Sequence, residues 1–143
     1  MTPSSALAGL RVVEYGNNVS AAFCAKLLGD LGAEVIKVER LQGDESRQRG
    51  PFPNDSPDSE KSALFLFLNT NKRGVTLNVE NARGRELFLR LVARADLLVE
   101  NYAPTDMQRL GLTYKDLQET SSSLVVTSIT PFGQSGPYRD FRG

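Results

Sequence analysis

Four short stretches of the sequence place polar, basic or aromatic side chains directly after apolar runs: residues 16–20, 39–40, 101–102 and 130–133. The first stretch precedes a helical pattern, and the free N–H groups of a helix start favour an anion such as a phosphate. Arg40 and Arg109 could each bind a phosphate through paired hydrogen bonds. Tyr102 and Phe132 could stack on a base. These residue types together favour a site for a nucleotide-like ligand.

Each of these residues also has a simpler interpretation. Arg40 could be a solvated surface residue, and Arg109 could satisfy the carbonyl groups at the end of its own short helix. Tyr102 and Phe132 could be ordinary residues at the edge of the core. Because a βαβ scaffold serves many functions, the predicted fold does not decide between the two interpretations.

Residues 10–40 predict the unit that would position the first two stretches. They indicate a strand, a tight turn, a helix and a second strand, which makes a βαβ unit with parallel strands. Ser20 is expected to cap the helix, and Gly32 to end it. The expected buried face of the helix comprises Phe23, Leu27, Leu28 and Leu31. Parallel sheets bind ligands at the carboxyl ends of their strands, where residues 16–20 and 39–40 would lie.

The rest of the chain continues the alternation of strands and helices. The pattern indicates a long loop at 41–61, a short helix or buried strand at 62–71, strands at 75–78, 95–100 and 123–130, helices at 81–94, 104–110 and 114–119, and a loop at 131–143. Residues 72–74 are expected to form a turn. This order predicts the α/β class, as a Rossmann-like, mainly parallel sheet with flanking helices. We expect one segment over residues 1–143.

Composition narrows the function classes. Of the 143 residues, 17 are Lys or Arg and 17 are Asp or Glu, so we expect neither nucleic acid nor an anionic membrane as partner. The sequence has no histidine and one cysteine, Cys24, so we expect no metal site. There is neither a secretory signal nor an apolar stretch of membrane length, so we expect a soluble protein in the cytoplasm.

A nicotinamide-binding domain is the first alternative to consider. Glu39 ends the second predicted strand, where an acid that binds a ribose would lie. The turn Gly16-Asn17-Asn18-Val19-Ser20-Ala21, however, has one glycine instead of the G-x-G-x-x-G fingerprint. A Cβ at the later positions obstructs the approach of a pyrophosphate, so the dinucleotide interpretation ranks low.

Several segments together resemble the N-terminal portion of the family III coenzyme A transferases. They are LAGLRVVEYG, LLGDLGAEVIKVER, GDESR followed by GPF, LNTNKRGVTLNV, GRELFLRLVARADLLVENYAP, RLGLTYKDL and SITPFGQSGPY. They follow the family's order over nearly the whole chain. The family includes formyl-CoA transferase, carnitine CoA-transferase and, by shared fold, α-methylacyl-CoA racemase.

The resemblance implies a metal-free enzyme that holds coenzyme A along the strand ends. Its substrates would be an acyl-CoA and a small carboxylic acid, and two full-length chains would interlock as a homodimer. The coenzyme-binding positions that carry over are Val19, Ser20, Arg40, Leu77, Asn101, Tyr102, Arg109, Thr130 and Phe132. Three departures are Val19, where formyl-CoA transferase has a glutamine, Thr130, where it has a lysine, and Ala21-Ala22, where the family often has Gly-Pro.

The resemblance assigns no catalytic residue to this chain. The transferases use an aspartate nucleophile that forms acyl anhydride and thioester intermediates, and we expect it beyond Gly143. Asp140 is too close to the preceding loop to match it. An acyl-CoA racemase, which a histidine just after Gly143 would favour, and a non-catalytic coenzyme A-binding module stay open as alternatives.

Overall fold

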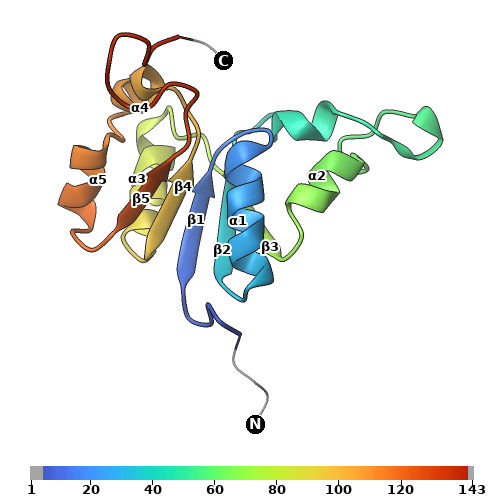
Figure 1. The fold of residues 1–143 in the computed structure, drawn as a ribbon, viewed down its shortest axis with the longest axis horizontal. Coiled ribbons are helices and arrows are strands. Elements are labelled where there is room, and N and C mark those ends of the chain that lie inside the picture. Colours follow the sequence, from blue (N-terminus) through green and yellow to red (C-terminus); the bar gives the residue numbers. More distant parts are fainter. Residues whose placement is uncertain (1–4, 142–143) are drawn as a thin grey trace.

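A computed structural model describes residues 5–141 and shows a five-stranded sheet with helices on both faces (Figure 1). All neighbouring strands run parallel, in the order β3-β2-β1-β4-β5. The strands are β1 (Arg11–Tyr15), β2 (Glu34–Glu39), β3 (Lys72–Thr76), β4 (Leu97–Glu100) and β5 (Val125–Ser128). The predicted α/β class with a parallel sheet is confirmed. The first four residues of the expected segment and the last two of its C-terminal loop lie outside the described residues.

Helices link successive strands along most of the chain. They are α1 (Ser20–Asp30), α2 (Ala63–Leu68), α3 (Ala82–Val92), α4 (Pro104–Leu110) and α5 (Tyr114–Thr120). The helices predicted at 81–94 and 114–119 are present as α3, capped by Asn81, and α5, capped by Thr113. Helix α2 decides the open choice for residues 62–71 in favour of a helix. Within residues 5–141, no helix has the length and apolarity needed to cross a membrane.

The sheet buries a different group of helices on each face, because successive strand residues point to opposite sides. Val13 of β1 packs in a cluster with Phe88 of α3 and Leu117 of α5. The neighbouring residue Val12 packs instead with Ala25 of α1. In Figure 1, α1 accordingly lies in front of the sheet and α3 behind it. The carboxyl ends of all five strands are left at one edge.

Helix α1 packs on the sheet through small residues, which the apolar spacing did not predict. Its buried positions are Ala21, Ala22, Ala25 and Gly29. Phe23, Leu27 and Leu31, which the helical spacing assigns to the core, are 42–52% exposed, so that prediction is wrong. The small and the large residues both recur once per helical turn. The small stripe faces the sheet because it allows the helix to lie close to β1 and β2.

Strand β3 begins earlier than the sequence predicts. Residues 72–74, expected as a turn, form the start of the strand, and the strand ends at Thr76. Lys72 can enter the sheet because Glu14 neutralises its ammonium group at 2.7 Å. Arg73 points outward, since its side chain is 74% exposed. The two charges that suggest a turn therefore belong to one edge strand, where Lys72 is buried beside Glu14 and Arg73 is exposed beside Glu34.

The segment between β2 and α2 is a long loop, as predicted. Its regular structure is limited to two short 3₁₀ turns, Glu45–Gln48 and Pro53–Asp55. Asp44 begins the first of these turns and is buried. The first turn thus holds this loop against the carboxyl edge of the sheet.

Candidate functional site

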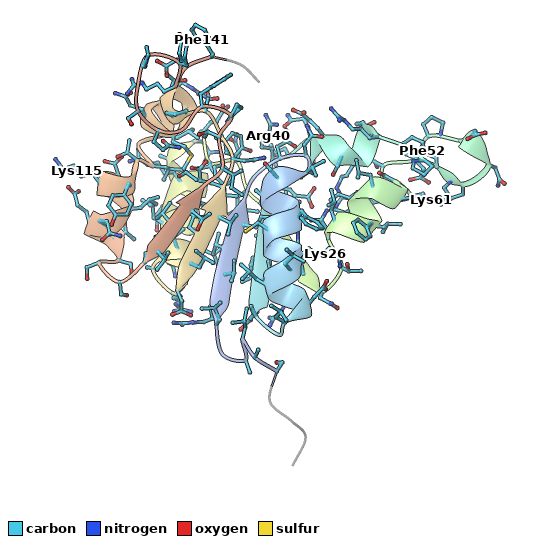
Figure 2. All side chains as sticks on the ribbon, viewed as in Figure 1. Lys26, Arg40, Phe52, Lys61, Lys115 and Phe141 are labelled. Atoms are coloured by element: carbon cyan, nitrogen blue, oxygen red, sulfur yellow. The ribbon has the colours of Figure 1, made fainter. Side chains whose placement is uncertain are left out.

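The order of the strands reverses between β1 and β4. Strands β2 and β3 extend the sheet on one side of β1, whereas β4 and β5 extend it on the other. Tyr15 at the end of β1 pairs in register with Glu100 at the end of β4. Open parallel sheets bind ligands beyond the carboxyl ends of the strands at such a reversal. Arg40 lies at this edge (Figure 2).

A cavity of about 190 Å³ opens at this edge and brings together three predicted site residues, Arg40, Tyr102 and Arg109. The other lining residues are Tyr15, Leu41, Asn78, Val79, Glu80, Asp106 and Leu110. The arginines come from the end of β2 and from α4, so they converge on this cavity from separate elements. The fold thus places two cations and an aromatic ring around one hollow.

Aromatic rings form one wall of this cavity. The ring centroids of Tyr15 and Tyr102 lie 4.6 Å apart, and that of Phe88 lies 4.9 Å from Tyr15 on the core side. Burial raises the pKa of both tyrosine hydroxyls, so both stay uncharged at neutral pH. The Arg40 guanidinium carbon lies 6.0 Å from the Tyr102 ring centroid. A flat, apolar group could stack here beside a cation.

Carboxylates accompany the two arginines of the cavity. Arg40 Nη2 lies 3.4 Å from Glu45 Oε1, and Arg109 Nη2 lies 3.3 Å from Glu80 Oε1. The arginine side chains are 47% and 59% exposed, and exposed pairs of this kind contribute only about 0–1 kcal/mol. Both guanidinium groups can therefore exchange a carboxylate for a ligand phosphate at small cost.

The turn after β1 is held by the side chain of Asn101. Its Oδ1 accepts from the Asn17 backbone N–H at 2.8 Å, and its Nδ2 donates to the Asn17 carbonyl at 2.7 Å. The same Nδ2 donates to the Ser20 hydroxyl at 2.8 Å. Ser20 is the first helical residue, while Val19 occupies the cap position without a side-chain cap bond. The predicted cap at Ser20 is wrong, because this hydroxyl serves Asn101.

Six of the nine predicted site residues do not line this cavity: Val19, Ser20 and Asn101, which belong to the turn just described, and Leu77, Thr130 and Phe132. Leu77 lines a separate hollow of about 400 Å³ with Leu87 and Leu91 of α3. Phe132 lies in the C-terminal loop, with its ring edge toward Phe141 at 6.3 Å between centroids. The Thr130 hydroxyl oxygen is buried without a hydrogen-bond partner among the described residues. Their contacts with a ligand stay predictions.

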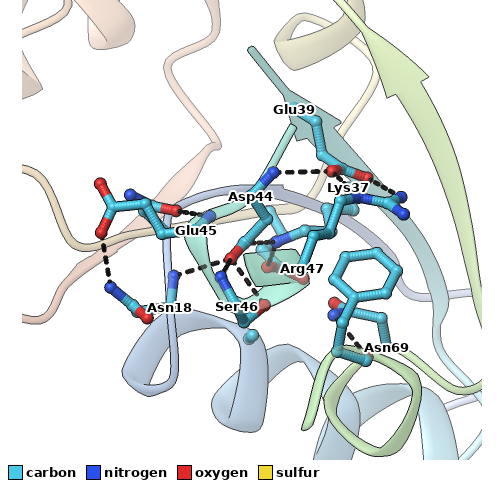
Figure 3. A network of polar contacts seen from close by, with 12 residues as sticks. Asn18, Lys37, Glu39, Asp44, Glu45, Ser46, Arg47 and Asn69 are labelled. Carbon is cyan, nitrogen blue, oxygen red and sulfur yellow. Dashed lines mark hydrogen bonds and ion pairs between the residues drawn. The ribbon is translucent and has the colours of Figure 1, made fainter. Parts of the chain in front are cut away.

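A cluster of buried charges beneath the site was missed by the sequence analysis. Lys37 Nζ lies 2.7 Å from Asp44 Oδ2 (Figure 3). It also lies 2.6 Å from Glu14 Oε1. Lys72 Nζ lies 2.7 Å from the second Glu14 oxygen. We call these four residues the buried ion cluster. The sequence contains a sign of this cluster, since Glu14 and Lys37 are charged residues inside apolar strand runs. Such residues are buried only when they are paired.

A second ion pair fastens the loop beside this cluster. Glu39 Oε2 accepts from Arg47 Nε at 2.7 Å and from the Asp44 backbone N–H at 2.9 Å. The Arg47 guanidinium also lies 3.6 Å above the centre of the Phe65 ring. Glu39, which could have been a ribose-binding acid, is therefore committed to holding the loop.

The pKa values of the buried ion cluster follow its geometry. Burial opposes the charge of Lys37, but Glu14 and Asp44 outweigh this and raise its pKa. Burial also opposes the charge of Asp44, yet Lys37 and Ser46 lower its pKa. Lys72 is different, because burial, together with the neighbouring positive charge of Lys37, lowers its pKa despite the attraction of Glu14. Lys37 and Asp44 thus remain a charged pair at neutral pH.

Comparison with known proteins identifies the family. Residues 7–143 match the family model described as CoA-transferase family III. The chain belongs to this family. It is 37% identical over 142 residues to the beta subunit of succinyl-CoA–L-malate CoA-transferase from Chloroflexus aurantiacus, covering 99% of this chain and 34% of that protein. It is 39% identical over 133 residues to mouse succinyl-CoA:glutarate CoA-transferase, covering 92% of this chain and 29% of the relative.

Solved structures of the family have the same fold. A CaiB/BaiF family protein from Brucella suis superposes with a TM-score of 0.88 at 37% identity, covering 98% of this chain and 37% of that one. The chain spans about a third of the length of the curated relatives it matches. The suspected membership of CoA-transferase family III is confirmed, and a nicotinamide-binding domain is ruled out as the family.

This family III chain also buries a carboxyl group at the end of β4. Glu100 is 1% exposed, and one of its oxygens accepts from the Tyr102 backbone N–H at 2.8 Å. No ion pair involves Glu100 within residues 5–141. Burial raises the pKa of this carboxyl group. Its charged form is therefore less favourable in the folded state than in the unfolded chain.

We expect Glu100→Gln to stabilise the fold at neutral pH. Because the folded-state pKa is raised, the contribution of Glu100 is fully present below its unfolded pKa of about 4.3 and is lost as pH rises through the folded value. Glutamine keeps the acceptor oxygen without the charge. Urea unfolding should thus give a higher free energy of unfolding for the variant than for the wild type at neutral pH, and a smaller difference between them at acidic pH. Glu119→Gln, on the exposed surface of α5, serves as control and should not change the free energy of unfolding. A difference between Glu100→Gln and the wild type that is equal at all pH values contradicts this account.

Proposed function

We propose that this chain is the coenzyme A-binding part of an enzyme that moves coenzyme A from an acyl-CoA to a free carboxylic acid. Its family membership supports the class of reaction, since relatives are named as transferases that use succinyl-CoA with malate or glutarate. The observation that carries the binding role is the convergence of Arg40, Tyr102 and Arg109 on one cavity at the strand reversal.

Each proposed contact follows from the chemistry of coenzyme A. Its phosphates would accept hydrogen bonds from Arg40 and Arg109, whose planar guanidinium groups suit phosphate oxygens. Its adenine would stack beside Tyr102, where the aromatic wall and Arg40 present a flat apolar surface next to a cation. These contacts anchor the carrier while leaving its thioester end free to reach the catalytic group.

The remaining predicted contacts are proposed from the family resemblance. The adenine contact expected of Leu77 is an alternative to stacking at Tyr102, because Leu77 lines a separate hollow. Val19 and Ser20 would meet the coenzyme at the turn that Asn101 holds. Thr130 and Phe132 would approach the pantetheine arm. The aspartate nucleophile is assigned to no residue of this chain; a carboxylate suits that role because it is ionised at neutral pH and needs no base. The interlocked homodimer and the cytoplasmic location stay predictions.

A calorimetric titration of the chain with coenzyme A tests the proposal. We expect Arg40→Ala and Arg109→Ala each to weaken binding by about 1.5–3 kcal/mol, because each removes a charged contact to phosphate. The same variants should bind pantetheine, which lacks the nucleotide phosphates, as the wild type does. Unchanged affinity for coenzyme A in both variants would remove the phosphate assignment.

Two control variants sharpen this titration. Arg90→Ala removes an exposed arginine of α3 outside the cavity lining and should leave the affinity unchanged. Glu80→Gln should raise the affinity, because Glu80 competes with the phosphate for Arg109 and repels it. Opposite signs for Arg109→Ala and Glu80→Gln point to an anion at Arg109, whereas a loss in both points to a general disturbance of α4.

A further inference from the structure

We propose that Asp44, held by Lys37, is a positioning residue that sets the turn at residues 17–18, beside Arg40, for coenzyme binding. The inference rests on the proposed function for its ligand. Asp44 and Lys37 lie outside the cavity lining and are buried, with side chains 0% and 2% exposed. They therefore act through other residues and not by contact with the coenzyme.

Asp44 joins three segments through its two carboxylate oxygens. Its Oδ1 accepts from the Asn18 backbone N–H at 3.0 Å and from the Ser46 backbone N–H at 2.8 Å. Its Oδ2 lies 2.7 Å from Lys37 Nζ, which comes from the centre of β2. The β1 turn, the first 3₁₀ turn of the loop and the sheet are thus fixed to one carboxylate (Figure 3).

The next residue carries this link to the cavity. The Glu45 backbone N–H donates to Asn17 Oδ1 at 2.8 Å, and Asn18 Nδ2 donates to Glu45 Oε2 at 2.8 Å. The other oxygen of Glu45 lies 3.4 Å from Arg40 Nη2. A shift of the loop at Asp44 would therefore move the turn, to which it is hydrogen-bonded, and would move the Glu45 carboxylate away from Arg40.

The turn is clamped from its other side by Asn101, which bonds both the N–H and the carbonyl of Asn17. Between these two clamps Asn18 adopts a φ of 61°, in the left-handed region that asparagine tolerates better than most residues. Where a dinucleotide-binding turn relies on glycines, this turn is shaped by side chains. Lys37 holds the Asp44 carboxylate in place, because the two charges are paired and both are buried from solvent.

The positioning role predicts a loss of affinity that stability does not explain. Asp44→Ala should weaken coenzyme A binding at least tenfold, since it frees the turn and the loop segment that packs against it together. The affinity of Asp44→Asn should lie between those of the wild type and Asp44→Ala, because its side-chain oxygen can still accept from the Asn18 N–H while the pair with Lys37 is lost. Leu117→Ala, which leaves a cavity in the core beneath the backbone of α5, is the control for lost stability. It should leave the affinity unchanged under conditions where each variant is folded.

Amide hydrogen exchange gives a second readout that needs no ligand. The N–H groups of Asn17 and Glu45 are bonded to Asn101 and Asn17 rather than to Asp44 itself. In Asp44→Ala their exchange should accelerate about tenfold or more relative to amides of β4, which shows that the turn has moved and not merely lost one acceptor.

The two readouts separate the inference from the proposed function. Accelerated exchange in a protein whose wild type binds no coenzyme A keeps the positioning of the turn and removes the coenzyme as its ligand. Wild-type binding that Asp44→Ala leaves unchanged overturns the inference, whatever the exchange shows. A loss of affinity no larger than that of Leu117→Ala also overturns it, because Asp44 would then contribute stability alone.

Discussion

Replacing Lys37 by methionine should lower the free energy of unfolding by about 3–5 kcal/mol. Methionine retains the apolar stem but removes the ammonium group that lies 2.6 Å from Glu14 and 2.7 Å from Asp44. Lys72, which pairs with Glu14 alone, would then be the single cation of the cluster, and the buried Asp44 carboxylate would be left without one. Breaking a buried pair is far more destabilising than its net contribution suggests, because the remaining charge has no solvent.

Urea unfolding at neutral pH measures this effect, and the chain offers a matched control. Lys61 Nζ also lies 2.7 Å from a carboxylate oxygen, that of Asp58, but its side chain is 62% exposed. Lys61→Met should leave the free energy of unfolding essentially unchanged, because water replaces the lost partner. Equal effects of Lys37→Met and Lys61→Met would mean that burial does not strengthen the dependence on Lys37.

A double variant distinguishes the stranded charge from lost packing. Lys37→Met combined with Asp44→Asn leaves Glu14 and Lys72 as one neutral pair, so part of the lost stability should return. If the single variant suffers only from poor packing of methionine, the second change adds to the loss instead. The sign of the coupling between the two substitutions therefore decides the cause.

Much of the fold follows from local signals in the sequence. Runs of valine, isoleucine and leucine predict β1, β2 and β4, because strands covered on both faces need apolar residues on both sides. Asn81 and Thr113 mark the starts of α3 and α5 through side chains that accept from backbone N–H groups three residues later. These features depend on residues close together in the chain, which is why the sequence reveals them.

Features that depend on distant partners escape the sequence. Glu14 is separated from Lys37 by 23 positions and from Lys72 by 58, so no spacing rule connects them. Similarly, nothing local tells whether Ala25 or Leu27 faces the sheet, because both stripes of α1 recur at helical spacing. Packing distance, a property of the assembled sheet, decides that question.

The candidate site lies between these two cases. In a parallel sheet the carboxyl ends of all strands meet at one edge. Arg40 and Tyr102 each follow a strand, so they lie near each other, as the predicted sheet implies. That Arg109 joins them, while Leu77 lies against α3, depends on how α4 and the segment after β3 settle on the sheet. The sequence could nominate these residues from the family resemblance, but not which of them share a cavity.

Gly16→Ala should lower the free energy of unfolding by roughly 3 kcal/mol and weaken coenzyme A binding together with it. A Cβ at this position would lie 2.4 Å from the Ala21 Cβ and 2.8 Å from Asn101 Oδ1. The Ala21 Cβ is bonded to the backbone of α1 and cannot rotate away, so the helix would have to move from β1. The Asn101 side chain, which holds the turn, would be displaced as well.

Gly74→Ala provides the comparison for Gly16→Ala. Gly74 lies in β3, and the nearest atom to an added Cβ, Glu39 Oε1, is 4.0 Å away, so this variant should keep full stability and affinity. Urea unfolding and coenzyme A titration of both variants measure the difference, and equal losses would show that close packing at Gly16 is not the cause. A loss confined to Gly16→Ala means that the single glycine of this turn serves the contact between strand and helix, one of the roles of glycine in dinucleotide-binding turns. The space beside the turn is then shaped by Asn17, Asn18 and Asn101, which is how, under the proposed function, a chain without the glycine fingerprint would hold a phosphate-bearing ligand at the same edge of its sheet.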